Sequence, residues 1–472
     1  MHRAVGRGSI LLFVTFCLLS CHSRHSIARE ALKGAGLSVN YRGVVPPVHF
    51  PLRVSPNHRY LVDNAGQPFL LHGDSPWDII VTPNETQVAQ YLDNRRAKGI
   101  NALLIELIEH KAWPNVAFHA PKNSQGIVPF RTPGDFSQPN DEYFAYAHGV
   151  VAAARSHGMA VLLTPAYMGY VDTDEGWWNE MSRMPVEDCV KYGKYLAMRF
   201  NDLDNIIWVH GGDRTPAPGS SSEACGLAIM HQVLAIPGSL HTAHWNRGVP
   251  DDGSLDEPAF APFVNLDAAY TYHLSYQLCA KEYARTPALP TFLIETQYEG
   301  EHATQPFELR RQAYWADLFC GAGQIMGNLP LWSFASGWTN ELESVGAHDM
   351  VYLVELLQPR RWFDLVPDHQ QKFVTAGFGH WGQADYIAAA ATDDGRLGIV
   401  YVPSTGRKSR TLSIQLSSFS APVALRWYNP TSGTFTLASE SPYPNHGIRE
   451  FRTPGDNGSR QNDWVMVFET NN

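Results

Sequence analysis

The sequence has few of the features that mark metal, nucleotide or nucleic-acid proteins. Only six of its 472 residues are cysteines, and none of the four that follow Cys21 forms a Cys-x-x-Cys pair, so no zinc framework is visible. None of the 20 histidines is followed by glutamate, which excludes the His-Glu-x-x-His motif of zinc peptidases. A P-loop, a Gly-x-Ser-x-Gly nucleophile elbow and a dinucleotide-binding glycine motif after the first strand are also missing. The net charge of −10 argues against nucleic acid as the main partner.

Near the N-terminus, the apolar run is too short for an ordinary membrane span. Ile10–Leu19 follows basic residues and precedes Ser20-Cys21, which is the order of a secretory signal. A helix that crosses a bilayer needs about 20 apolar residues. Because Leu18-Leu-Ser-Cys21 resembles a bacterial lipobox, we expect residues 1–21 to be a lipoprotein-type signal with Cys21 as the lipidated residue. Cleavage by ordinary signal peptidase is the alternative.

Export follows from this signal. We expect an outer-membrane or cell-surface lipoprotein that contacts the membrane only through the lipid at Cys21, or otherwise a periplasmic or secreted protein. Residues 22–45 show no apolar periodicity and are predicted to be a tether. The remaining cysteines are far apart, and either one or two disulfides or buried thiols would fit an exported protein. These cysteines are Cys189, Cys225, Cys279 and Cys320.

A parallel barrel is the fold that the middle of the chain predicts. Apolar runs rich in β-branched residues alternate with helical segments, and we count eight strand-then-helix units. Their strands begin near residues 68, 100, 159, 205, 239, 263, 289 and 323. The predicted helices cover residues 84–98, 141–157, 186–200, 223–234, 276–284, 307–320 and 345–357. This repetition favours an α/β fold, a (β/α)8 TIM barrel over residues 46–360, rather than an open doubly wound sheet.

From about Arg361 the pattern changes to short apolar runs separated by glycine-containing turns. Such short strands at regular spacing predict an antiparallel β-sandwich domain over residues 361–472. An apolar fraction of 44% and a charged fraction of 17% are typical of a globular chain long enough for these two domains.

Two carboxylates follow strands that face each other across the predicted barrel. The run Ile206–Val209 ends at Gly211-Gly212 and is followed by Asp213, after the fourth strand. Glu295 ends the seventh strand. Barrel enzymes keep their chemistry at the C-terminal ends of the strands, and two carboxylates across a cleft are what glycoside hydrolysis requires. The alternatives are that Asp213 caps a turn and that Glu295 pairs with a barrel cation.

Three motifs resemble the apiosidase-like catalytic domain of glycoside hydrolase family 140. They are Tyr60-Leu-Val-Asp63 with Pro68-Phe-Leu-Leu-His-Gly-Asp-Ser-Pro-Trp77, then Trp208-Val-His-Gly-Gly-Asp213, and Glu295-Thr-Gln-Tyr-Glu-Gly300. The resemblance covers roughly residues 50–358, and the tail resembles a small β domain named for collagen binding. It implies a retaining enzyme in which Asp213 is the general acid/base and Glu295 the nucleophile. The best-known activity of the family is release of apiose-linked side chains from pectin.

Other side chains at the ends of the barrel strands are candidates for sugar hydroxyls or ring stacking. The predicted substrate-binding residues are Asp74, Trp77, Glu106, Tyr167, His244, Tyr298, Glu299 and Trp332. For each of them, packing or pairing inside the barrel is the alternative role.

The sequence therefore predicts a glycoside hydrolase that acts on plant cell-wall polysaccharide, with a carbohydrate partner and without a metal or organic cofactor. Two rivals remain. One is another retaining glycosidase that acts on arabinofuranosides or β-hexosides, and the other is a non-catalytic surface protein that binds glycan. Carboxylates at both positions argue against the second rival, since binding alone requires neither an acid nor a nucleophile.

Overall fold

A computed structural model describes residues 47–110, 120–170, 173–246 and 251–470. The predicted signal, Cys21 and the predicted tether lie outside these residues, so the lipid anchor remains a prediction. Within the described ranges, none of the helices combines the length and the apolar character needed to cross a bilayer.

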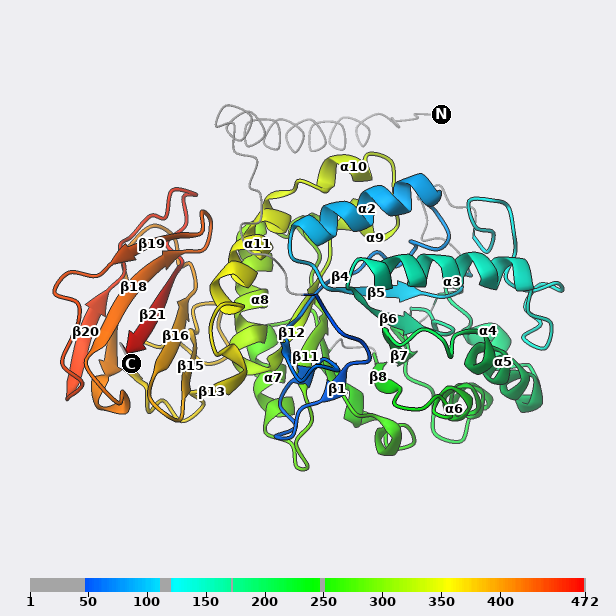
Figure 1. Cartoon of the computed structure of the whole chain (residues 1–472), viewed down its shortest axis with the longest axis horizontal. Coiled ribbons are helices and arrows are strands. Elements are labelled where there is room, and N and C mark those ends of the chain that lie inside the picture. The colour runs from blue at the N-terminus through cyan, green and yellow to red at the C-terminus, as the bar shows by residue number, and fades with distance from the viewer. Residues whose placement is uncertain (1–46, 111–119, 171–172, 247–250, 471–472) are drawn as a thin grey trace, which may run out of the picture. The chain divides into compact units, whose positions relative to one another are not determined.

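The predicted barrel is confirmed, with all eight parallel strands at the expected places (Figure 1). Its strands are β4 (Leu71–Asp74), β5 (Ala102–Glu106), β6 (Ala160–Thr164), β7 (Ile206–Gly211), β8 (Leu240–His244), β10 (Asp267–Thr271), β11 (Thr291–Glu295) and β12 (Gly321–Met326). Nearly every residue of these strands is buried, because the interior of the barrel covers one face and the helices cover the other. This burial on both faces explains why the strands appear in the sequence as continuous apolar runs.

Ser254 helps to close the barrel between β8 and β10. Its hydroxyl donates to the carbonyl of Ala243 on β8 (2.7 Å) and accepts from the amide of Ala268 on β10 (2.8 Å). A short strand that the sequence did not predict, β9 (Asp251–Gly253), pairs antiparallel with β10 just before this serine. One buried side chain thus bridges two strands that lack a regular ladder.

The seven predicted helices are confirmed, and they surround the strands. They are α2 (Glu85–Ala97), α3 (Asp141–Ser156), α5 (Val186–Arg199), α6 (Ser221–Val233), α7 (Ser275–Tyr283), α8 (Pro306–Phe319) and α11 (Val345–Leu357). Three further one-turn helices follow barrel strands, namely α4 (Trp178–Met181), α9 (Leu329–Trp332) and α10 (Trp338–Glu341). Local sequence sets the helix starts: Asn84 and Gln87 form a capping box at α2, and Ser344 caps α11.

A small antiparallel sheet precedes the barrel. It contains β1 (Arg53–Val54), β2 (Leu61–Val62) and β3 (Pro68–Phe69). The turn between β2 and β3 forms because the Asp63 carboxylate accepts from the amides of Ala65 and Gln67, while Gly66 adopts a φ of 78°.

The C-terminal β domain consists of two antiparallel sheets around one apolar core. One sheet contains β13 (Leu365–Pro367), β15 (Ala388–Thr392), β16 (Leu397–Val402), β21 (Trp464–Thr470), β18 (Val423–Asn429) and β19 (Thr434–Leu437). The other contains β14 (Val374–Ala376), β17 (Thr411–Gln415) and β20 (Ile448–Arg452). Strands β13, β14 and β20 were not predicted, because they are short or carry exposed, charged residues.

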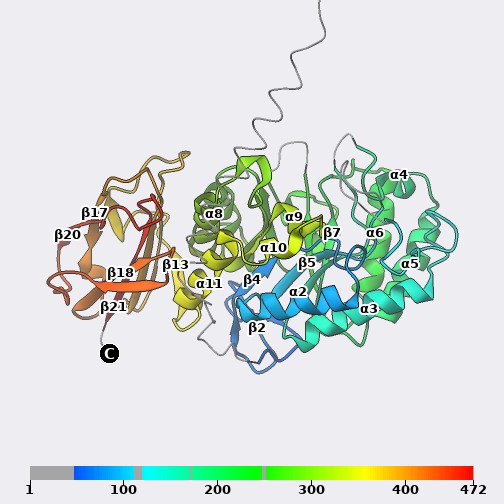
Figure 2. The ribbon, with the colours of Figure 1, turned by 90° about the horizontal axis from the view of Figure 1, so that it is seen from above.

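This β domain lies beside α8 and α11 of the barrel in both views (Figures 1 and 2). The Arg310 guanidinium on α8 donates to both oxygens of Asp463 before β21 (2.7 and 3.0 Å) and to Asp349 on α11 (2.6 Å). All three side chains are buried. The rings of Tyr314 and Tyr401 also stack across the junction, with their centroids 4.5 Å apart. These contacts dock the domain on the barrel.

Of the two possibilities left open for the cysteines, the structure has disulfides. Cys189 of α5 is bonded to Cys225 of α6, and Cys279 of α7 is bonded to Cys320 just after α8. Each bond ties neighbouring helices of the barrel wall and closes a loop, which lowers the conformational entropy of the unfolded chain.

We predict that Arg310→Ala strongly destabilises the protein. The substitution leaves two buried carboxylates without their cation, which costs about 3–5 kcal/mol of unfolding free energy. The matched control Arg361→Ala removes an exposed arginine that pairs with Asp364 and Asp394, and should cost less than about 1 kcal/mol. Urea unfolding followed by circular dichroism measures both. Equal effects of the two substitutions would show that the buried pairs do not stabilise the junction.

Candidate active site

A cavity of about 440 Å³ lies at the C-terminal ends of the barrel strands. Aromatic rings and carboxylates make up most of its lining. The lining residues are Trp77, Glu106, Tyr167, Tyr170, Glu175, Asp213, Asn246, Tyr270, Tyr272, Glu295, Tyr298, Glu301, His302, Leu329 and Trp332. Rings beside oxygen acceptors are the surface that a sugar needs, since its C–H faces stack and its hydroxyls donate.

Two glycines let the chain carry Asp213 into the cavity. Gly211 has a φ of 96°, and a Cβ there would meet the carbonyl of His244 at 2.3 Å. At Gly212 a Cβ would meet the Met168 amide at 2.7 Å. Only glycine allows this backbone to pass so closely between the ends of β6 and β8. The Gly-Gly pair that ends the strand in the sequence therefore positions the carboxylate that follows it.

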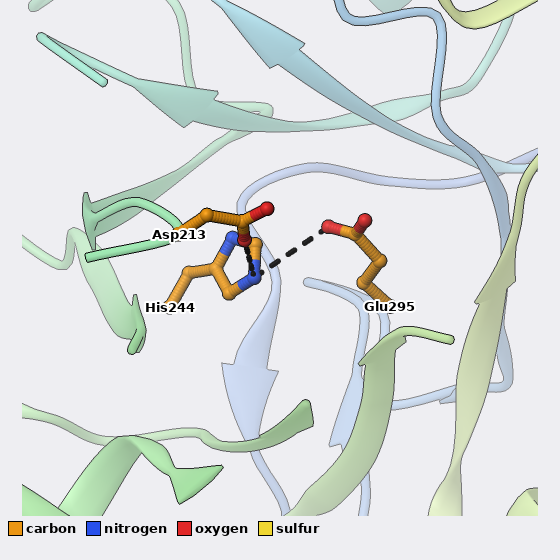
Figure 3. Close-up of side chains that lie close together, drawn as sticks. All are labelled: Asp213, His244 and Glu295. Carbon is orange, nitrogen blue, oxygen red and sulfur yellow. Dashed lines mark ion pairs between the residues drawn. The ribbon is translucent and has the colours of Figure 1, made fainter. Parts of the chain in front are cut away.

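Asp213 and Glu295 face each other with His244 between them (Figure 3). His244 Nε2 lies 3.0 Å from Asp213 Oδ1 and 3.5 Å from Glu295 Oε2, and one atom from each of the three side chains lies within 4.8 Å of the other two. The His244 side chain is 1% exposed, whereas the side chains of Asp213 and Glu295 are 15% and 7% exposed. Among the described residues, this trio is the one group of ligand atoms close enough to share a metal ion.

The surroundings of Glu295 oppose its ionised form. Burial, then the charge of Asp213 and that of Glu301, raise the pKa of Glu295 well above its usual range. The hydroxyls of Tyr272 and Tyr298 act in the opposite direction, because they donate to the carboxylate. Tyr272 Oη lies 3.1 Å from Glu295 Oε1 and 3.2 Å from Glu301 Oε2, so it joins the two carboxylates.

Trp77 and Tyr298 form an aromatic floor that lines the cavity, as predicted. The indole Nε1 of Trp77 donates to the Tyr298 hydroxyl at 2.7 Å. Trp77 also stands against Tyr167, with ring centroids 5.5 Å apart. Trp332, which follows the last strand, lines the same cavity. Each of these residues is therefore accessible to a ligand in the cavity.

A second group of carboxylates stands beside the catalytic candidates. Glu106 lines the cavity as predicted, and burial followed by the charge of Glu109 raises its pKa well above the usual range. Burial and the charge of Glu109 also raise the pKa of Asp78, which is fully buried and does not line the cavity. Burial, then Glu109 and Asp213, raise the pKa of Glu175 to about 8.

Asp74, predicted to bind sugar, has a structural role instead. Its carboxylate accepts from the Tyr91 hydroxyl and from Arg95 Nε, both at 2.6 Å, and it is 1% exposed. Glu299 is likewise away from the cavity. It accepts from the Ser344 hydroxyl (2.6 Å) and the Gly346 amide (2.9 Å) at the start of α11. Hydrogen-bond donors of the protein itself therefore bind the carboxylates of both Asp74 and Glu299.

His244 is also displaced from its predicted role. It does not line the cavity and lies beneath the two catalytic candidates, where Tyr270 packs edge-on against its ring at 4.2 Å.

Several cavity residues were missed by the sequence reasoning. Tyr270 and Tyr272 stand at and just after the end of β10, so the rule that selected the other strand ends applies to them too. Glu175 lies in the loop after β6, and Glu301 begins a turn six residues past Glu295. No periodic signal marks those two loop positions.

Two family models match the chain. Residues 55–364 match the family described as "Apiosidase-like, catalytic domain". Residues 366–469 match the family described as "Putative collagen-binding domain of a collagenase". Among curated proteins, no sequence matches the chain.

Solved structures share the fold. One is a glycoside hydrolase family 5 protein from Bacteroides vulgatus, with a TM-score of 0.73 and 22% identity over 89% of this chain and 93% of that one. Another is described as a glycoside hydrolase, with a TM-score of 0.74 and 20% identity over 89% and 98% of the two chains.

We predict opposite shifts of the Glu295 pKa on changing its two neighbours. Tyr272→Phe removes a donor to the ionised carboxylate and should raise the pKa, whereas Glu301→Gln removes a negative charge and should lower it, each by about one pH unit. Carboxyl titration by ¹³C NMR measures both. Glu142→Gln, an exposed site on α3, is the control. Shifts in the same direction would contradict the electrostatics described here for the site.

Proposed function

Because the chain belongs to the family of apiosidase-like catalytic domains, we propose that it is a retaining glycosidase with Asp213 and Glu295 as its catalytic pair. The observation that carries the proposal is the separation of the two carboxylates, whose nearest oxygens lie within 4.8 Å. Retaining glycosidases place these groups about 5–5.5 Å apart, whereas inverting enzymes leave about 6.5–9.5 Å for a water molecule.

The division of labour follows from the surroundings of each carboxylate. Glu295 is held by the Tyr272 hydroxyl and lies deeper, which suits a nucleophile that must meet the anomeric carbon in a fixed orientation. Asp213 is more exposed and stands at the start of the loop after β7, which suits the acid that protonates the leaving oxygen and later activates water. His244 Nε2 lies beside both carboxylates, 3.0 Å from Asp213 Oδ1 and 3.5 Å from Glu295 Oε2.

In the mechanism the two carboxylates share one proton, which in the reactive form resides on Asp213 and leaves Glu295 ionised. Asp213 gives this proton to the glycosidic oxygen as Glu295 attacks the anomeric carbon. The glycosidic bond breaks and a covalent glycosyl ester forms on Glu295. Asp213, now ionised, takes a proton from water, and the resulting hydroxide displaces Glu295 with a second inversion. The anomeric configuration of the product is therefore that of the substrate.

The charge of the cavity supports a neutral sugar at the cleaved position. Five carboxylates line the cavity, and among the described residues no lysine or arginine does so. A uronate would add a further negative charge to carboxylates that already raise one another's pKa, and like charges brought together cost several kcal/mol at an interface. We therefore assign the protein to the removal of neutral side-chain sugars from plant cell-wall polysaccharides, with apiose-bearing pectin the candidate that the family suggests.

Export and lipidation at Cys21 are part of the proposal. Two disulfides support export, because such bonds persist in oxidising compartments.

We predict that Asp213→Asn and Glu295→Gln each lower kcat by at least about 10²–10⁴-fold. Glu142→Gln, far from the cavity, should leave kcat unchanged. The assay is sugar release from a panel of plant polysaccharides by the chain lacking residues 1–21, with ¹H NMR reporting the anomer first formed. Retained activity in either folded variant, or an inverted product, would contradict the assigned pair. Saturable binding without turnover would favour a glycan-binding protein.

We further predict that neutral glycosides are cleaved with a kcat/KM at least about 100-fold above that of the uronides with the same ring and linkage. Above about pH 8, where Glu175 is ionised, Glu175→Gln should narrow this ratio, because it removes a charge from the cavity wall. Arabinofuranosides and β-hexosides in the same series distinguish the rival glycosidases. Faster cleavage of the uronide would overturn the assignment of a neutral sugar.

A further inference from the structure

We propose that Asp213, His244 and Glu295 form a binding site for a divalent transition-metal ion of the zinc class. The three side chains come from the ends of β7, β8 and β11, and they converge on one point at the base of the cavity (Figure 3). Imidazole nitrogen and carboxylate oxygen are both ligands by which proteins bind zinc.

The distances fit a tetrahedral ion. Zinc binds histidine nitrogen at about 2.0–2.1 Å and carboxylate oxygen at about 2.0–2.2 Å, so adjacent ligand atoms in a tetrahedron lie about 3.4 Å apart. His244 Nε2 lies 3.0 Å from Asp213 Oδ1 and 3.5 Å from Glu295 Oε2. The third distance, between the ligand oxygens of Asp213 and Glu295, is at most 4.8 Å. A side-chain movement of little more than 1 Å would shorten it to the distance found in a tetrahedral site.

His244 is held ready as a ligand. Its side chain is 1% exposed, and within the described part of the chain neither ring nitrogen makes an aligned hydrogen bond. Trp77 stacks on one side of the ring at 6.0 Å, and Tyr270 packs against it at 4.2 Å. Nε2 therefore points into the gap between the carboxylates without a competing donor or acceptor in line with it.

The ligand chemistry selects among cations. Imidazole with carboxylate suits zinc, nickel and copper, whereas calcium and magnesium prefer oxygen ligands alone and in larger number. The hydroxyl of Tyr272 supports the site from outside, since it orients Glu295. Three protein ligands leave a fourth position that faces the cavity.

An ion at this point inhibits the proposed reaction. It would occupy the gap between Asp213 and Glu295 in which the anomeric carbon and the leaving oxygen must lie, so sugar and metal exclude each other. This consequence rests on the proposed glycosidase function, whereas the binding of the metal does not.

The test is titration of the metal-stripped chain, lacking residues 1–21, with Zn²⁺ by calorimetry and with Co²⁺ by visible absorption. We expect saturable binding of one ion per chain and a tetrahedral cobalt spectrum. Asp213→Asn, His244→Gln and Glu295→Gln should each weaken binding by about 100-fold or more. His302→Gln is the matched control, because this exposed histidine lines the same cavity outside the trio.

Three outcomes would overturn the inference: the absence of saturable binding, equal affinity in all three ligand variants, or loss of binding in His302→Gln. Circular dichroism establishes that each variant is folded. Because the titrations contain no sugar, their failure leaves the glycosidase proposal standing. Conversely, a protein that binds zinc through the trio but cleaves no glycoside would overturn only the proposed function.

Discussion

Repulsion between the two carboxylates at the mouth of the barrel is the constraint that organises the site. Asp213 and Glu295 approach within 4.8 Å in a largely buried pocket, where low polarity strengthens the interaction between their charges. The fold offsets this cost with hydroxyl donors on Glu295. Two negative charges this close stabilise a positively charged group that lies between them. An oxocarbenium-like transition state is such a group.

Such a pair needs a rigid support, and several parts of the chain supply one. Gly211 and Gly212 fix the path of the backbone into Asp213, and two disulfides tie helices of the barrel wall. The β domain adds to this by docking on α8 and α11 through the buried Arg310 cluster. A displacement of about 1 Å at a catalytic group is enough to cost much of the rate, so remote rigidity has a direct chemical use.

The sequence predicts the barrel well because its signals are local. Eight continuous apolar runs alternate with seven helices, and both carboxylates of the candidate pair stand where strands end. The same rule fails at Asp74 and Glu299, since a strand-end carboxylate can be used internally. The partners of Asp74 are Tyr91 and Arg95, which lie on the next helix and can be identified only in three dimensions.

Loops account for what could not be predicted at the site. Glu175 lines the cavity at a place where the backbone of Gly169 packs against that of Glu175 and Gly176. Such a contact leaves no periodic signal. The docking of the β domain on the barrel could not be predicted either. Arg310 and Asp463 are 153 residues apart, and in the sequence each looks like an ordinary surface charge.

The most direct test of the central claim is to trap the covalent intermediate. A 2-deoxy-2-fluoro glycoside with a good leaving group, of the sugar that the panel identifies, slows the second step more than the first in a retaining enzyme. Mass spectrometry of the digested protein should then find one sugar per chain, attached to the peptide that contains Glu295. A label on a different residue would contradict the assignment of the nucleophile. A protein that turns over the parent sugar without ever being labelled would contradict the retaining mechanism.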